Sequence, residues 1–215
     1  MPVTDFLTRT RASYDTIAAD YAVWIEAELA AKPLDRAVLA AFAEFVRDAG
    51  AVADVGCGPG RITAHLHALG VPAFGIDLSP EMIARARERH PGLRFEVGSM
   101  TELALDDSSL GGAVAWYSLM HVPHVEDVLA EFHRVLAPGG HLQLAFPAGE
   151  GVLHKKTAGG HPVDLDFHQR HPDHLARQLH DAGLPVSARL LREPDSEGDY
   201  PETTPQAYLL ARKPG

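Results

Sequence analysis

The chain has 215 residues, a length that suits one compact domain with a sizeable buried core. Its 46% hydrophobic and 22% charged residues are ordinary globular values, which exclude disordered and fibrous classes. The formal net charge of −10 would repel a phosphate backbone, and no stretch approaches about 18 consecutive apolar residues, so we expect neither a nucleic-acid partner nor a membrane span.

Two helices are expected before the first strand. Apolar residues recur at helical spacing over residues 14–29, and Pro33 ends that pattern. A second apolar helix face covers residues 34–46, and Gly50 stands where a left-handed C-terminal cap belongs.

Short apolar runs then alternate with helical segments, a pattern typical of buried parallel strands. One helix has Ser79 as its N-cap and ends before Pro91, and another covers about residues 125–136 and ends at a Pro-Gly-Gly turn. Repeated strand, helix and strand units predict an α/β, Rossmann-like, doubly wound and mostly parallel sheet. The expected strands are residues 51–55, 73–76, 93–97, 113–116 and 142–146.

The last third of the chain changes character. Residues 147–171 are rich in glycine, histidine and proline, and we expect them to be irregular. A helix follows from Pro172 and ends at Gly183. Two more apolar runs, residues 186–191 and 207–210, are expected to close the sheet as an antiparallel pair.

A glycine-rich loop joins the first strand to the next helix. Gly56, Gly58 and Gly60 would let the chain turn tightly and let a ligand approach the backbone without a Cβ in the way. Asp77 ends the second strand 21 residues after Gly56, where a carboxylate can accept both hydroxyl protons of a ribose. Arg61 stands where a dinucleotide fingerprint has its third glycine, so a nicotinamide-dependent oxidoreductase is the alternative rather than the first choice.

Four segments resemble, in order and spacing, the motifs of class I S-adenosylmethionine-dependent methyltransferases. The resemblance covers roughly residues 14–146, and it is to small-molecule members of quinone synthesis and secondary-metabolite tailoring. It implies transfer of a methyl group from S-adenosylmethionine to an oxygen, nitrogen or carbon atom of a small molecule. The segments are residues 54–60, 76–82, 98–100 and 134–140.

The resemblance also implies a set of cofactor contacts. The three glycines shape the methionine pocket, Asp54 holds the loop and the amino group, and Asp77 binds the ribose. Leu78 packs on the adenine, and Ser99 stands where relatives often carry Asp, a stronger partner for the adenine amino group. Tyrosines of the leading helix close over the cofactor, and a carbonyl at the end of the fourth strand receives the methionine ammonium. The implied cofactor-binding residues are Tyr14, Tyr21, Asp54, Gly56, Gly58, Gly60, Asp77, Leu78, Ser99, Met100 and Trp116.

Methyl transfer from a sulfonium requires few dedicated catalytic residues, because positioning alone can supply about 7 to 11 kcal/mol of the barrier. A base is needed only where the accepting atom carries a proton. The catalytic candidates follow the fourth and fifth strands: His121 first, then His168 and Tyr117. The chain has no short metal-ligand motif, so we expect no metal.

We expect one domain over residues 1–215. The single cysteine, Cys57, favours a reducing cytoplasm, and the sequence lacks the basic and apolar segments of a secretion signal. A noncatalytic module that binds S-adenosylmethionine remains a third hypothesis, and the sequence does not indicate an oligomeric state. The expected parts are an N-terminal helical cap (1–50), a cofactor-binding core (51–146), a substrate-cover segment (147–171) and a closing helix with two strands (172–215).

Overall fold

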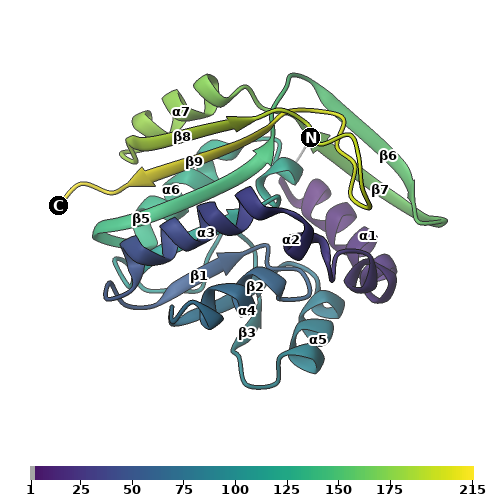
Figure 1. Cartoon of the computed structure of the whole chain (residues 1–215), viewed down its shortest axis with the longest axis horizontal. Coiled ribbons are helices and arrows are strands. Elements are labelled where there is room, and N and C mark those ends of the chain that lie inside the picture. The colour runs from purple at the N-terminus through teal and green to yellow at the C-terminus, as the bar shows by residue number, and fades with distance from the viewer. Residues whose placement is uncertain (1–2) are drawn as a thin grey trace.

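The computed structural model describes residues 3–215, which form a seven-stranded sheet between layers of helices and a separate two-stranded hairpin (Figure 1). The helices are α1 (Val3–Trp24), α2 (Glu28–Ala31), α3 (Pro33–Val46), α4 (Arg61–Ala68), α5 (Pro80–Arg89), α6 (Val125–Val135) and α7 (Pro172–Asp181), with a 3-10 turn η1 (Leu119–His121). The strands are β1 (Val52–Val55), β2 (Ala73–Asp77), β3 (Phe95–Val97), β4 (Leu110–Trp116), β5 (Leu136–Pro147), β6 (Val152–Ala158), β7 (His161–His168), β8 (Val186–Arg192) and β9 (Gln206–Arg212).

The strands of the large sheet follow the order β3-β2-β1-β4-β5-β9-β8. Strands β1 to β5 run parallel to one another, and β9 lies antiparallel to both β5 and β8. Every residue of β1 and β4 is buried, which explains why their sequences are continuous apolar runs. The predicted α/β, Rossmann-like, mostly parallel sheet with a C-terminal antiparallel pair is confirmed.

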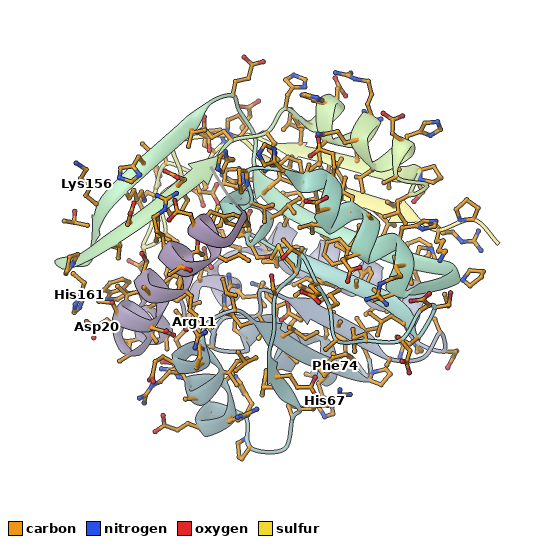
Figure 2. All side chains as sticks on the ribbon, turned by 180° about the vertical axis from the view of Figure 1, so that it is seen from behind. Arg11, Asp20, His67, Phe74, Lys156 and His161 are labelled. Carbon is orange, nitrogen blue, oxygen red and sulfur yellow. The ribbon has the colours of Figure 1, made fainter. Side chains whose placement is uncertain are left out.

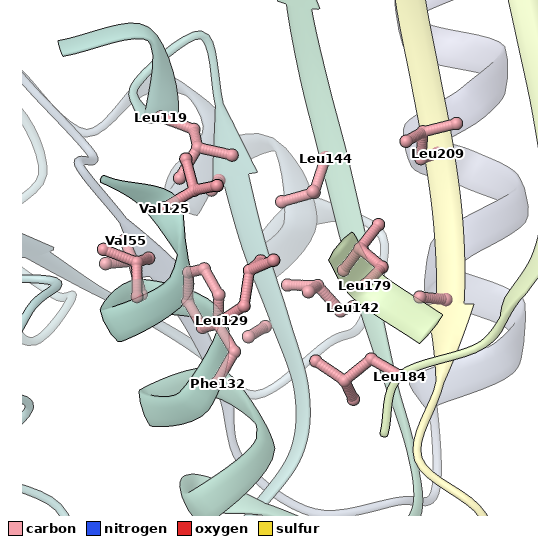
Figure 3. Close-up of a cluster of buried hydrophobic side chains, with 14 of the residues drawn as sticks. Val55, Leu119, Val125, Leu129, Phe132, Leu142, Leu144, Leu179, Leu184 and Leu209 are labelled. Carbon is pink, nitrogen blue, oxygen red and sulfur yellow. The ribbon is translucent and has the colours of Figure 1, made fainter. Parts of the chain in front are cut away.

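Helices cover both faces of this sheet. Figure 3 shows Leu129 and Phe132 of α6 packed beside Leu142 of β5, in the cluster that also takes in α7. On the opposite face, Phe42 of α3 and Leu66 of α4 belong to a second buried cluster. Burial of these apolar surfaces, at roughly 25 cal/mol per Å², is the main force that holds the layers together. Within residues 3–215, no helix is long and apolar enough to cross a membrane.

The predicted N-terminal helices are present with different bounds. The first begins at Val3 rather than near residue 14 and ends at Trp24, and the four-residue α2 separates it from α3. The early start was missed because residues 5–13 are mostly polar and only Phe6 and Ser13 among them are buried. Gly50 has the expected positive φ of 102°, but it lies beyond a turn that follows the end of α3.

Two boundaries further along the chain are informative. The predicted cap of α5 is confirmed, since the Ser79 hydroxyl accepts a hydrogen bond from the Met82 amide at 3.1 Å. Strand β5 begins directly after α6, so the Pro-Gly-Gly turn that was expected to precede the strand lies within it. Pairing with β4 shifts register there, and Gly139 has a φ of 84°, a left-handed value that glycine adopts without strain.

The prediction that residues 147–171 are irregular is wrong, because β6 and β7 form an antiparallel hairpin. Its turn is Gly159-Gly160, with φ values of 55° and 85°, the left-handed pair that a two-residue hairpin turn needs. Val163 and Leu165 of β7 pack with α1, whereas β6 is exposed along most of its length. The hairpin therefore lies over α1 at one end of the sheet (Figure 1).

Candidate functional site

A pocket with about 870 Å³ of space, partly open to solvent, lies where β1, β2, β3 and β4 end and α1 crosses them. Crevices at the carboxyl ends of the strands are where open α/β sheets bind ligands. Asp54, Gly60 and His168 do not line this pocket. Of the sequence-predicted site residues, its lining contains Tyr14, Tyr21, Gly56, Gly58, Asp77, Leu78, Ser99, Met100, Trp116, Tyr117 and His121.

The glycine loop forms the floor of the pocket. Gly56 has a φ of 78°, and a Cβ at that position would lie 2.2 Å from the Cβ of Ser118. Gly58 has a φ of 54° and almost no atoms near the place of its missing Cβ, with Tyr21 at 3.9 Å. Only glycine fits the first position, and its use at both leaves the backbone open to a ligand.

Asp77 stands at the rim of this loop with both carboxylate oxygens fixed. The Gly58 amide donates to Oδ2 at 2.8 Å, and the Ser79 amide donates to Oδ1 at 2.8 Å. Burial raises the pKa of Asp77 to about 6, and the backbone hydrogen bonds oppose that rise. Each oxygen keeps lone-pair capacity for a further donor, so this carboxylate can accept hydrogen bonds from a ligand with two hydroxyls.

Asp54 and Gly60 lie beneath the loop rather than on the lining of the pocket. Asp54 is fully buried and accepts a hydrogen bond from the Thr63 hydroxyl at 2.7 Å, and burial raises its pKa to about 6. Gly60 is the left-handed N-cap of α4, where a Cβ would meet the ring of Phe95 at 2.7 Å. Both residues shape the loop from below.

His121 and Tyr14 form a pair on the wall of the pocket. The Tyr14 hydroxyl lies 2.7 Å from Nε2 of His121, and Nδ1 lies 3.1 Å from the backbone oxygen of Asp166. A carbonyl oxygen can only accept, so Nδ1 carries the proton and Nε2 accepts from Tyr14. Burial lowers the pKa of His121 to about 4 and raises that of Tyr14 well above its ordinary value. Near neutral pH the imidazole is uncharged, and the Tyr14 hydroxyl keeps its proton.

Trp116 ends β4, Tyr117 directly follows it, and both line the pocket. Tyr117 has a φ of 54°, an uncommon value for a bulky residue and a form of strain that occurs at functional sites. Its hydroxyl lies 3.4 Å from that of Tyr208, which in turn donates to Asp35 at 2.7 Å. Burial raises the pKa of Tyr117 well above its ordinary value, so the hydroxyl keeps its proton near neutral pH.

Several residues that line the pocket were not predicted from the sequence, among them Phe6, Thr10, Arg61 and Ser118. Phe6 and Thr10 lie on the part of α1 that was not predicted to be helical. Arg61 directly follows the glycine loop, and this position was the available signal for it. Ser118 follows β4, and its hydroxyl donates to the Val55 carbonyl at 2.7 Å, which ties β4 to the loop.

The hairpin is held against α1 by polar contacts. The guanidinium of Arg9 pairs with Asp164 at 3.0 Å and with Asp166 at 3.1 Å. At the outer end, His161 lies 2.6 Å from Asp20, and Figure 2 shows these two side chains side by side. The remaining catalytic candidate, His168, lines a second cavity on this side, which shares His121 with the pocket.

Residues 53–144 match the family described as methyltransferase domain. The chain is 36% identical over 90 residues to the demethylmenaquinone methyltransferase of Chlorobaculum tepidum, a match that covers 41% of this chain and 37% of the relative. It is 32% identical over 151 residues to the ubiquinone biosynthesis O-methyltransferase of Methylococcus capsulatus, over 62% of each chain. Both matches cover less than two thirds of the relative's own length.

Among solved structures, the fold is similar to the 1,6-didemethyltoxoflavin-N1-methyltransferase of Burkholderia thailandensis, whose crystal structure contains 1,6-didemethyltoxoflavin and S-adenosylhomocysteine. The TM-score is 0.70 at 19% identity, and the alignment covers 100% of this chain and 92% of that one. At this level of identity the similarity is one of fold.

Proposed function

We propose that this chain, whose residues 53–144 belong to the methyltransferase domain family, transfers a methyl group from S-adenosylmethionine to an oxygen, nitrogen or carbon atom of a small molecule. One observation carries the proposal: a single pocket collects the glycine loop after β1, Asp77 after β2, Ser99 after β3 and Trp116 at the end of β4. These features come from four neighbouring parallel strands. Together they offer an open backbone, a carboxylate that can accept hydrogen bonds from a ribose, and two further walls.

The proposed cofactor contacts follow the strands. Gly56 and Gly58 would lie under the methionine part, with the Trp116 carbonyl receiving the ammonium. Asp77 would accept the two ribose hydroxyls with the lone pairs that the Gly58 and Ser79 amides leave unused. The adenine would lie against Leu78 with Ser99 and the Met100 amide at its edge.

Two of the predicted contacts act differently in this proposal, and the two tyrosines keep their expected role. Asp54 and Gly60 would hold the loop from beneath, since neither lines the pocket. Tyr14 and Tyr21, on α1, would close over the cofactor, and Tyr21 lies beside Gly58 of the glycine loop. Their rings contact each other edge to face at a centroid distance of 5.7 Å, which supports a common wall.

S-adenosylmethionine supplies a methyl carbon activated by the positive sulfur. The residues of this chain have to align the acceptor, exclude water and, for an O–H or N–H acceptor, take up its proton. We assign proton removal to the Tyr14–His121 pair: an acceptor that donates to the Tyr14 oxygen would release its proton as Tyr14 donates to Nε2. The Asp166 carbonyl keeps the imidazole in the tautomer that makes this possible. Tyr117 and His168 would position the acceptor.

The proposal extends to the setting of the reaction. The chain would act in the cytoplasm on free small molecules rather than on nucleic acid or a membrane, in keeping with its net charge of −10 and its single, buried cysteine. Residues 1–215 would work as one domain, in which α1 and the β6–β7 hairpin cover the acceptor side of the pocket.

Native mass spectrometry tests the proposed function. The protein should gain the mass of one S-adenosylmethionine per chain, and a mixture of small acceptors should convert that cofactor to S-adenosylhomocysteine with a methylated product. A chain that binds the cofactor with no acceptor turnover would be the noncatalytic module instead. A chain that binds neither cofactor form would contradict the proposal.

A further inference from the structure

A second cavity adjoins the pocket on the side of the hairpin. It takes in about 810 Å³ of space, part of which is open to solvent. It shares Phe6, Thr10 and His121 with the pocket, so His121 forms part of a wall common to both spaces. The remaining lining comes from α1, from the segment between η1 and α6, and from the hairpin. Apolar Phe6, Pro123 and Val152 face imidazoles across this space.

The charges around the second cavity leave no excess of positive charge. Arg9 is its only arginine among the described residues, and two carboxylates, Asp164 and Asp166, hold the guanidinium at 3.0 and 3.1 Å. Burial lowers the pKa of both His121 and His168, so these rings are neutral near pH 7. The Arg9 guanidinium is thus already engaged by two carboxylates, and His154 contacts the same carboxylates at 3.6 and 2.8 Å.

The arginines of the adjoining pocket are also paired. Arg61 contacts Glu28 at 2.6 Å, and Arg11 lies 3.7 Å from Asp15. In the part of the chain that the structure describes, no lysine lines either space. A carboxylate or phosphate on the acceptor would therefore have to enter against negative charge or displace an existing ion pair.

We propose that the second cavity holds the methyl acceptor and that this acceptor is an uncharged aromatic ring with an O–H or N–H group. This inference rests on the proposed function. A ring suits the space because apolar Phe6, Pro123 and Val152 line it together with the imidazoles of His121 and His168, and aromatic rings pack well on such side chains. A cationic acceptor would be repelled by the positive sulfur that it must approach.

The group transfer balances with the residues at hand. The lone pair of the acceptor oxygen or nitrogen forms a bond to the methyl carbon, the bond from that carbon to sulfur breaks, and its electron pair stays on sulfur. The O–H or N–H group of the acceptor has to reach past His121 into the adjoining pocket, which Tyr14 lines. Its proton then leaves through the Tyr14 hydroxyl to Nε2 of His121 and on to solvent. The site loses one positive charge at sulfur and gains one at the imidazole, so its net charge is unchanged during the step.

Matched acceptor pairs test this inference on the full chain. One pair is catechol and its ring-carboxylated form protocatechuate, and the other is 4-hydroxyquinoline and its ring-carboxylated form kynurenate. Each compound is tested as a substrate with labelled S-adenosylmethionine. Each is also tested as a ligand by NMR in the presence of S-adenosylhomocysteine. The uncharged member of each pair should have a kcat/KM, or an affinity, higher by about tenfold or more. Preference for the carboxylated members, or binding by no member, would overturn the inference.

A charge variant sharpens the test. Asp164→Asn with Asp166→Asn removes the two carboxylates that hold Arg9 in the cavity wall, so the preference should move toward the carboxylated acceptors by about tenfold or more. Asp164→Asn alone, whose side chain is half exposed, should move it in the same direction by less and is the safer variant for folding. Asp173→Asn, which loses a surface pair with Arg189, is the matched control and should change nothing. An unchanged preference in both cavity variants would contradict the role of these charges.

These experiments distinguish failure of the proposed function from failure of this inference. Loss of cofactor binding by the native chain would contradict the proposed function and this inference together. Normal cofactor binding and turnover with a preference for anionic acceptors would contradict the inference alone.

Discussion

The carboxylate of Asp77 makes the most specific proposed contact with the cofactor. Replacing it in Asp77→Ala should weaken binding of S-adenosylmethionine by about 1.5 to 3 kcal/mol, because charged hydrogen bonds to the ribose are lost. Calorimetry measures the change, and Asp106→Ala, which alters an exposed carboxylate in a distant loop, is the control. If the dissociation constant of the Asp77 variant stays the same, Asp77 does not bind the cofactor.

His121 carries the proposed proton transfer. His121→Ala should keep the affinity for the cofactor and lower turnover by about 100-fold, and Tyr14→Phe should lower turnover in the same direction because it removes the hydroxyl between acceptor and imidazole. His67→Ala, an exposed imidazole on α4, is the matched control. Normal turnover in both His121→Ala and Tyr14→Phe would remove the pair from the mechanism.

The pH profile gives a second readout for His121. A base works in its deprotonated form, so the rate should rise with pH through the pKa of the imidazole in the folded protein. Burial lowers that pKa to about 4, and the rate should therefore vary little with this group between about pH 6 and 8 and fall toward pH 4. An inflection near the ordinary histidine value would show that the ring is not in the buried pair described above.

At the scale of elements, the turn from β1 to α4 is the most constrained segment of the site. Gly56→Ala should destabilise the fold by more than about 1 to 2 kcal/mol and weaken cofactor binding, because a positive φ is combined with a Cβ that collides with Ser118. Gly70→Ala separates the two effects: Gly70 also has a positive φ, of 84°, but its nearest neighbour would be at an ordinary 3.7 Å. Thermal unfolding and calorimetry of both variants measure the difference; equal effects would contradict the steric argument.

The cover made by α1 and the β6–β7 hairpin is expected to become more ordered when ligands bind. Helix α1 contacts the hairpin through the Arg9 ion pairs, and Tyr14 of α1 is linked to it through His121, whose Nδ1 lies 3.1 Å from the backbone oxygen of Asp166. Hydrogen exchange in residues 3–24 and 152–168 should slow on addition of cofactor and acceptor, while the edge strand β8 keeps its rate. Equally fast exchange with and without ligands would count against a cover that responds to them.

At the scale of the whole molecule, the sequence predicted those elements whose pattern is local. The buried strands are continuous apolar runs, and Ser79 with the proline that follows it indicates the N-cap of α5. The hairpin was missed because β6 is exposed and only β7 alternates, although Gly159-Gly160 between the two runs was a usable turn signal. The early start of α1 was missed because its apolar face there is narrow.

The residues of the site also divide into those that could be predicted from the sequence and those that could not. The glycine loop and Asp77 are close in sequence and carry a fixed spacing, so they could be found without a structure. The Tyr14–His121 bond joins residues 107 positions apart, and the contact of Nδ1 with the Asp166 carbonyl depends on a hairpin that the pattern did not reveal. The second cavity forms where α1, η1 and the hairpin come together. Contacts between elements so far apart in the chain cannot be predicted from a local sequence pattern.

A calorimetric titration of the native chain with S-adenosylmethionine, S-adenosylhomocysteine and NAD tests the central claim most directly. The account predicts that the first two bind and that NAD does not, because Arg61 replaces the third glycine of a dinucleotide fingerprint and already pairs with Glu28 beside the loop. Tighter binding of NAD than of either S-adenosyl compound would contradict the account.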